Sequence, residues 1–164
     1  MAARTQLTLF VPPCEAADEL EVLRRWLDPV QFGLIAAHIT LCREDEIEGF
    51  DPALIRQRLA TATPLTLKFG AAETFSGHGI LLPCIEGEEA FMALRQRILA
   101  SQEIRRQAPH ITLAHPRNPR APGNDPTSAA KLGAHRSISF TSVCRIQQAG
   151  PSDPWTLLDR FPLG

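Results

Sequence analysis

The sequence predicts an α+β protein of two pseudo-symmetric lobes, each a mostly antiparallel sheet flanked by helices, with a cleft between them. Three observations support this prediction. The tetrapeptide His-Ile-Thr-Leu occurs twice, at residues 38–41 and 110–113. An alternating strand pattern and then a helical pattern precede each copy, at similar offsets to the histidine (38 − 6 = 32 and 110 − 79 = 31). The 164 residues have the length of a single domain built from two interleaved lobes.

The first half of the chain contains four predictable segments. Alternating apolar residues predict a strand at residues 6–11. Leucines at helical spacing predict a helix over residues 15–27, in which we expect Trp26 to belong to the core. The acidic run at residues 44–46 is typical of a solvated loop. An Asp-Pro pair suited to a helix start predicts a further helix over residues 51–62.

The second half predicts a hairpin, a helix, a loop and further strands. The Gly-His-Gly sequence at residues 77–79 predicts a tight turn with His78 in solvent. Prolines interrupt residues 115–123 and predict a long loop directly after the second motif. Clean alternation predicts one continuous strand over residues 137–146. The other expected elements are strands at residues 65–69, 73–76, 80–85 and 155–161 and a helix at residues 88–100.

Charge and cysteine usage restrict the classes of partner. A net charge of -1 and a pI of about 6.5 argue against binding to long duplex nucleic acid, which requires a basic surface. No apolar run is long enough to span a bilayer, and the first residues lack the apolar region of a signal peptide. We therefore expect a cytoplasmic protein that makes no use of a membrane. The cysteines lack zinc-site spacing, so we expect no metal: Cys14, Cys42, Cys84 and Cys144.

Within a strand, alternate side chains point to the same face, so each motif copy places a histidine and a threonine on one face and two apolar residues on the other. Two such strands side by side would offer two imidazoles and two hydroxyl groups to one ligand. Imidazole exchanges protons near neutral pH, and hydroxyl groups donate hydrogen bonds to phosphate oxygens. The pair therefore favours acid-base chemistry at a phosphate group.

The paired motif resembles the 2H phosphoesterases, and within them the RNA 2',3'-cyclic phosphodiesterases that are also called 2'-5' RNA ligases. The resemblance covers nearly the whole chain. It includes a first strand that ends at Pro12 and Pro13, the motif separation of 72 residues (110 − 38), and a closing strand pair at residues 141–146 and 155–163. It implies hydrolysis of 2',3'-cyclic phosphates on RNA ends or small cyclic nucleotides to a 2'-phosphate, without metal or cofactor. It also implies a possible reverse 2'-5' ligation. We further expect the protein to be a monomer.

The resemblance also implies roles for the four motif residues. His38 would donate a proton to the departing ribose 3' oxygen, and His110 would accept a proton from water. Thr40 and Thr112 would hold the non-bridging phosphate oxygens. The sequence alone leaves the choice of acid and base open.

Three further residues are candidates for substrate binding. Arg43 looks like the position after the first motif where the family carries a basic residue. Relatives often carry arginine soon after the second motif, whereas this chain has His115 and Arg117 there. For both of these a solvated loop role is the alternative. Two other functions remain open: a non-catalytic RNA-end or nucleotide-binding module, and a hydrolase with a histidine-ligated metal.

Overall fold

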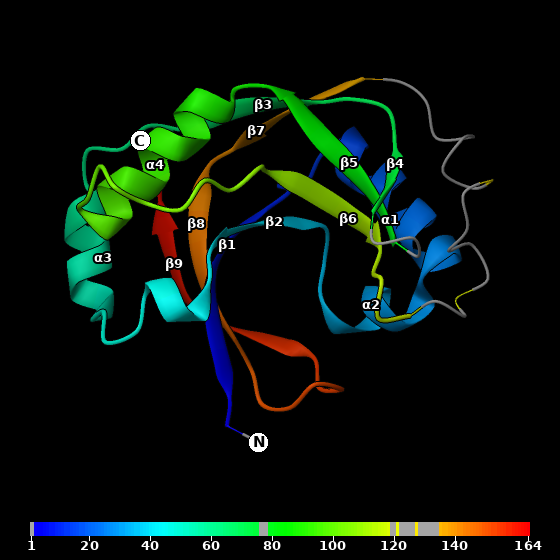
Figure 1. Ribbon diagram of the computed structural model, residues 1–164, viewed down its shortest axis with the longest axis horizontal. Helices are drawn as coiled ribbons and strands as arrows, with labels where there is room; N and C mark the ends of the chain where they lie inside the picture. The colour runs from blue at the N-terminus through cyan, green and yellow to red at the C-terminus, as the bar shows by residue number, and fades with distance from the viewer. Residues whose placement is uncertain (1, 76–78, 119–120, 122–126, 128–134) are drawn as a thin grey trace.

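The computed structural model describes residues 2–75, 79–118, 121, 127 and 135–164, which form two antiparallel sheets with helices at both ends (Figure 1). The first sheet has the strand order β2-β1-β8-β9. Its strands are β1 (Arg4–Phe10), β2 (His38–Cys42), β8 (Ser142–Gln148) and β9 (Trp155–Pro162). Three of these strands, β1, β2 and β9, were predicted to within two residues at each end, from the segments 6–11, 38–41 and 155–161.

The second sheet is centred on β5 (Gly79–Glu86), which pairs with β6 (His110–Ala114) along one edge. Along its other edge β5 pairs with β3 (Leu65–Phe69) and β4 (Glu73–Phe75), and β3 in turn pairs with β7 (Arg136–Phe140). All of these pairs are antiparallel. The two sheets and their flanking helices confirm the predicted α+β class.

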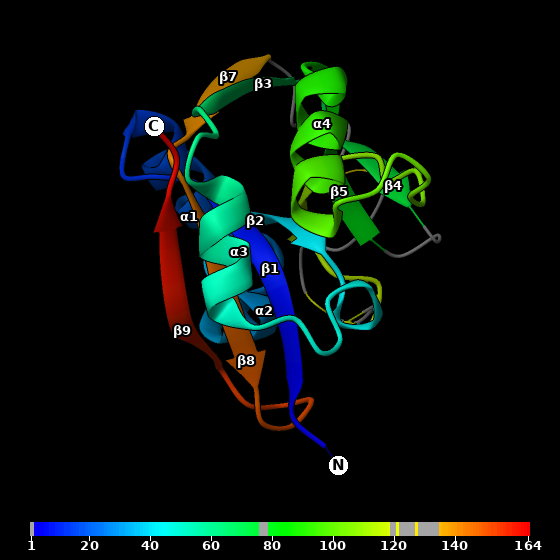
Figure 2. The ribbon, with the colours of Figure 1, turned by 90° about the vertical axis from the view of Figure 1, so that its left-hand side faces the viewer.

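The helices gather at opposite ends of the molecule (Figure 1). Figure 2 shows α3 (Pro52–Leu59) beside α4 (Glu88–Leu99) at one end, and these two helices are in contact. The other end holds α1 (Glu15–Leu27) and α2 (Pro29–Leu34), while a short 3-10 helix, η1 (Glu44–Glu46), follows β2. Packing crosses between the lobes, since α1 contacts β6 and α4 contacts β2.

One apolar cluster runs through both lobes and includes the inward face of each motif copy. Ile39 and Leu41 of β2, like Ile111 and Leu113 of β6, are at most 1% exposed. Full burial of each such side chain contributes about 1.5–3 kcal/mol. The motif histidines and threonines are only partly buried, which confirms the predicted division of each motif strand into an apolar and a polar face.

The predicted continuous strand at residues 137–146 is wrong. β7 ends at Phe140 and pairs with β3 of the second sheet, whereas β8 begins at Ser142 and pairs with β1 and β9 of the first sheet. The chain therefore passes from one sheet to the other at Thr141. Alternation continues through this residue, and alternation reports burial rather than the identity of the partner strand.

Two expectations for the first lobe also need correction. Trp26 is 58% exposed, because Leu20, Arg24 and Leu27 occupy the inward face of α1. The acidic run is not simply a solvated loop, since it forms η1 and the side chain of Glu46 is only 7% exposed. Of the predicted hairpin turn, residues 77 and 78 lie outside the described residues, as do residues 119, 120, 122 and 123 of the predicted long loop.

Candidate active site

The two motif strands lie side by side at the junction of the lobes, as Figure 1 shows for β2 and β6. His38 is the first residue of β2 and pairs with Phe10 of β1, while His110 is the first residue of β6 and pairs with Pro83 of β5. Thr40 follows two residues after the first histidine and, in the same way, Thr112 follows the second. The structure therefore gives both histidine-threonine pairs the same position in neighbouring strands.

The two imidazole rings are anchored in the same way. Nδ1 of His38 lies 2.8 Å from the carbonyl oxygen of Ala36, and Nδ1 of His110 lies 3.0 Å from that of Ala108. A carbonyl oxygen only accepts hydrogen bonds, so Nδ1 carries a proton in both rings. Nε2 of each ring is therefore the nitrogen that is not used in this hydrogen bond and that could exchange a proton.

An aromatic ring also stands beside each histidine. The ring centroids of Phe10 and His38 are 6.1 Å apart, and those of Phe75 and His110 are again 6.1 Å apart, with tilts of 58° and 53°. Phe75 lies directly over Gly79, where a β-carbon would collide with its ring. A glycine at position 79 thus allows Phe75 to reach the second histidine.

Burial lowers the pKa of His38 to about 4. The hydrogen bond to Ala36 opposes this effect, whereas the positive charge of Arg24 and the neighbouring His110 and His115 lower the pKa further. The influence of His110 and His115 on this ring indicates that the three imidazoles share one neighbourhood. At neutral pH the His38 ring is uncharged.

An ion pair on α1, between the buried Arg24 and the partly exposed Glu21, positions the segment in front of His38. Arg24 donates to Glu21 Oε1 at 2.7 Å and to the carbonyl oxygen of Ile35 at 2.6 Å. The same Glu21 oxygen accepts the backbone N–H of Ala37 at 2.9 Å. Both neighbours of Ala36 are therefore fixed from α1, and Ala36 supplies the carbonyl group that orients His38.

In the second lobe, Arg95 of α4 has a similar function and also reaches across to the first motif. Its guanidinium donates to the Leu41 carbonyl oxygen at 2.6 Å, to Glu46 Oε2 at 2.7 Å and to the Arg105 carbonyl oxygen at 3.0 Å. Gln107 lies beside it, accepts from Arg95 and donates to the carbonyl oxygen of Thr40. One buried side chain thus connects the first motif with the segment that leads to His110.

The carboxylate of Glu46 completes this network. Burial acts to raise the pKa of Glu46, but the hydrogen bonds from Arg95 and from the Arg43 backbone N–H outweigh it and hold the pKa below its usual value. Arg24 and Arg95 share a further property, since the Nε atom of each is buried and has no hydrogen-bond partner among the described residues. Neither arginine was predicted from the sequence: the main partners of Arg95 lie 54 and 49 residues away, at Leu41 and Glu46, and Arg24 looks like an ordinary polar residue of an amphipathic helix.

Asp28 fixes the start of the loop that follows β6. It is fully buried, caps α2 through the Gln31 N–H, and accepts the backbone N–H of His115 at 2.9 Å. The side-chain amide of Asn118 donates to both of its carboxylate oxygens, at 3.1 and 3.0 Å. His115 is therefore held close to the motif histidines, and Arg117 Nε donates to its Nδ1 at 3.1 Å.

The electrostatic environment of His115 resembles that of His38. Burial lowers the pKa of His115 to about 4, and the charge of Arg117 contributes to the lowering. By contrast, Arg43 is exposed. His38 is the first residue of β2, whereas Arg43 follows the last residue of that strand and caps η1. Five residues of extended chain separate these two positions, or roughly 16 Å. The structure thus brings His115 to the histidine pair, with Arg117 bound to it, but not Arg43.

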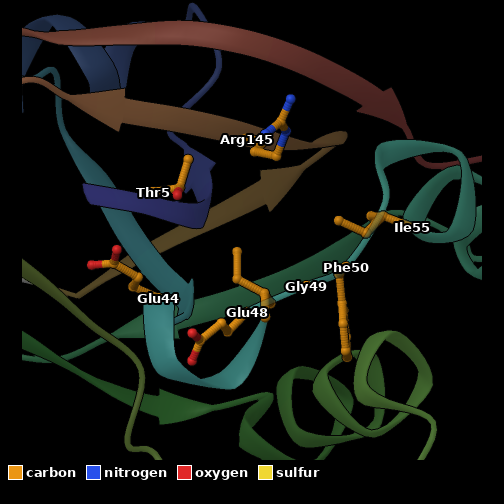
Figure 3. Close-up of a pocket in the computed structure, with 8 residues that line it drawn as sticks. Thr5, Glu44, Glu48, Gly49, Phe50, Ile55 and Arg145 are labelled. Carbon is orange, nitrogen blue, oxygen red and sulfur yellow. The ribbon is translucent and has the colours of Figure 1, made fainter. Parts of the chain in front are cut away.

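A separate cavity of about 200 Å³ contains none of the motif residues (Figure 3). Figure 3 shows Thr5 and Arg145 on strands of the first sheet and the acidic side chains of Glu44 and Glu48 on the opposite wall. Thr5 points to the face of β1 opposite to Thr8, which pairs with Thr40. The sheet therefore separates this cavity from the motif residues, and Arg145 already forms an ion pair with Asp159 at 2.6 Å.

In the described part of the chain, no three side chains of His, Cys, Asp or Glu are grouped as ligands for a metal ion. None of the described helices combines the length and the apolar character needed to cross a membrane.

Comparison with known proteins places this chain in a family. The chain matches the 2'-5' RNA ligase superfamily over residues 12–141. The crystal structure of E. coli LigT complexed with NADP+ is similar, with a TM-score of 0.63 and 17% sequence identity over 99% of this chain and 99% of that chain. A crystal structure of a phosphoesterase has a TM-score of 0.59 and 15% identity, again over 99% of both chains. No curated protein sequence matches this chain significantly.

Two antiparallel sheets that each contribute a His-x-Thr strand to one junction define a phosphoesterase of the 2H class. The chain belongs to the 2'-5' RNA ligase superfamily.

Proposed function

We propose that this protein is a metal-independent 2',3'-cyclic phosphodiesterase that acts on RNA ends or small cyclic nucleotides and releases a 2'-phosphate. The observation that carries the proposal is the matched anchoring of His38 and His110, each through Nδ1 to a backbone carbonyl oxygen. Opening a cyclic phosphodiester requires a base on one side of phosphorus and an acid on the other. Two imidazoles with free Nε2 atoms on neighbouring strands fit this requirement.

The threonines of the motifs would bind the phosphate group. Thr40 and Thr112 are partly exposed on the histidine face, where their hydroxyl groups can donate to the non-bridging oxygens. When a 5'-hydroxyl group replaces water, the same residues would run the reaction in reverse and form a 2'-5' linkage. The ring strain of the cyclic phosphate would drive that step without a cofactor.

We assign the donor role to His38 and the acceptor role to His110 by resemblance to the family. The pKa of about 4 opposes this assignment in the substrate-free protein, because the uncharged His38 ring carries its one proton on Nδ1 and has none on Nε2 to donate. A phosphate anion beside the ring raises its pKa, since an opposite charge favours the charged form. We therefore infer that His38 takes up its proton when the substrate binds.

The solved relatives support a nucleotide ligand. E. coli LigT has been crystallised in complexes with ATP, with NADP+ and with 3'-AMP. Each of these molecules combines a phosphate group with a nucleoside. We propose that this chain likewise binds nucleotide or RNA ends, as a cytoplasmic monomer.

The test is hydrolysis of a panel of nucleoside 2',3'-cyclic phosphates, with identification of the phosphate position in the product. We expect His38→Ala and His110→Ala to lower the rate roughly 10²–10⁴-fold each, the usual contribution of one general acid or base. His135 is exposed, so His135→Ala is the matched control and should retain the wild-type rate. Wild-type rates in both motif variants would refute the proposal.

The same assay separates the two alternative functions. A histidine-ligated metal hydrolase would lose activity in EDTA, whereas the proposed enzyme keeps it. A non-catalytic binding module would bind 3'-AMP without turning over any cyclic nucleotide. Binding of 3'-AMP together with an absence of turnover by the wild-type protein would therefore favour the binding module.

A further inference from the structure

The face of the first sheet that carries His38 continues along β1 into a second group of polar side chains. Paired residues of antiparallel strands point to the same face, as do alternate residues of one strand. Phe10 pairs with His38, so the even-numbered residues of β1 share the histidine face. On this face Gln6 Nε2 donates a hydrogen bond to Thr8 Oγ1 at 3.0 Å. Arg4, the first residue of β1, lies on the same face.

Arg4 is held on this face by uncharged partners. It pairs with Gln148 of β8, donates to its side-chain oxygen, and stands 5.2 Å from the ring centroid of Trp155 on β9. Gln148 is 1% exposed, and its own amide donates to the Asp153 carbonyl oxygen at 2.8 Å. The acceptor is therefore fixed, and it holds the guanidinium group in one place. Figure 1 shows this start of β1 and the β8–β9 turn at the same end of the sheet.

Arg117 brings a second positive charge to the same side of the molecule. Burial and the charge of Arg4 lower the pKa of Arg117, against the opposing charge of Asp28. Arg4 also contributes to the lowered pKa of His115, so the charge of Arg4 acts on both residues of the Arg117–His115 pair. Among the described residues, no carboxylate forms an ion pair with either arginine. The guanidinium groups of Arg4 and Arg117, beside the His115 imidazole, could together donate hydrogen bonds to a phosphate anion.

We propose that Arg4 and Arg117 form a second anion subsite, which binds a backbone phosphate of the RNA segment that leads to the cyclic phosphate. Arg4 lies roughly 13 Å along β1 from Thr8, the partner of Thr40, so the subsite takes a different phosphate group from the one at the motifs. A basic track beside an aromatic ring is the usual surface for single-stranded nucleic acid. The inference rests on the proposed function and narrows its substrate class to single-stranded oligonucleotide ends.

The experiment compares two substrates: adenosine 2',3'-cyclic phosphate, and a trinucleotide that ends in the same group. We expect the wild-type protein to have the higher kcat/KM for the trinucleotide. The ratio of the two kcat/KM values should fall roughly ten-fold in Arg4→Gln and in Arg117→Gln, as for the loss of one charged hydrogen bond. Added salt should reduce the wild-type ratio in the same direction.

Arg56→Gln is the matched control, because Arg56 also stands over an aromatic ring, that of Phe161, at 5.0 Å. It belongs to α3, outside the proposed subsite, and its variant should keep the wild-type ratio. A wild-type preference for the mononucleotide would overturn the subsite. So would an unchanged ratio in Arg4→Gln, or a ratio that Arg56→Gln lowers equally.

The subsite can fail independently of the proposed function. When the wild-type protein cleaves neither substrate, the proposed function fails, and binding of a labelled trinucleotide with a 3'-phosphate then tests the subsite alone. Weaker binding by Arg4→Gln than by Arg56→Gln supports the subsite, whereas equal binding overturns it. Thermal unfolding of each variant identifies any that does not fold, and Arg117→Gln provides a second, independent variant.

Discussion

Acid should destabilise the folded protein through His38. Burial lowers its pKa from 6.5 to about 4 in the folded chain, and unfolding restores the ordinary value. Between these two pH values the unfolded chain binds a proton that the folded chain does not bind, so the free energy of unfolding rises with pH. The contribution of His38 is therefore fully present above pH 6.5 and is lost as the pH falls toward 4.

The size of the effect follows from the two pKa values. The interval from 6.5 to about 4 corresponds to about 3.4 kcal/mol, at about 1.36 kcal/mol for each pH unit. About 2 kcal/mol of this is already lost at pH 5. Folded proteins are stable by only about 5–15 kcal/mol, so the loss is large enough to measure by urea unfolding.

The assay compares the wild-type protein with His38→Gln at pH 7.5 and pH 5. We expect the wild-type protein to lose about 2 kcal/mol more than the variant between these pH values. His115, with a pKa that burial and Arg117 lower to about 4, is present in both proteins and cancels. His135→Gln changes an exposed histidine and should behave as the wild type. An equal loss in the wild type and in His38→Gln would refute the argument.

Two further predictions concern the network and the roles of the histidines. Arg95→Met should lower the free energy of unfolding in urea by about 3–5 kcal/mol, because it removes the nearest ion-pair partner of the buried Glu46 and leaves only the more distant Arg105 at 3.7 Å. Arg58→Met should lower the free energy of unfolding less, by about 1–3 kcal/mol, since Arg58 donates to one carbonyl oxygen, that of Ile98, at 2.6 Å. Equal losses in the two variants would contradict the stabilising role of the Arg95 network. A p-nitrophenyl phosphodiester needs no acid for its leaving group, so His38→Ala should keep activity toward it while His110→Ala should not. The opposite pattern would exchange the two roles.

The motif strands were predictable because their signals are local. Ile39 and Leu41 alternate with the histidine and threonine of one strand, and strand geometry alone assigns them to the core. The helix start at Asp51 and Pro52 is equally local, since Asp51 Oδ1 accepts the N–H of Ala53 at 2.7 Å. In these cases the partners lie within a few residues, so a single sequence contains the information.

The supporting residues were not predictable, because their partners are distant in the chain. Arg95 bonds Leu41, which is 54 residues away, and Asp28 bonds His115, which is 87 residues away. A buried arginine or aspartate looks like an ordinary surface residue until its partners are known. Trp26 was predicted to be buried but is exposed, since an apolar side chain on an amphipathic helix can still lie on the solvent-facing side.

The two lobes hold each other's motif, and this explains how residues 72 positions apart (110 − 38) form one site. Arg95, on the helix that follows β5, bonds the backbone of the first motif at Leu41. Asp28, between the helices that follow β1, bonds the backbone just beyond the second motif at His115. Because each connection crosses between lobes, each motif strand is held in part by a residue of the other lobe. Loss of either connection should therefore disturb the spacing between the two imidazoles before it disturbs either sheet.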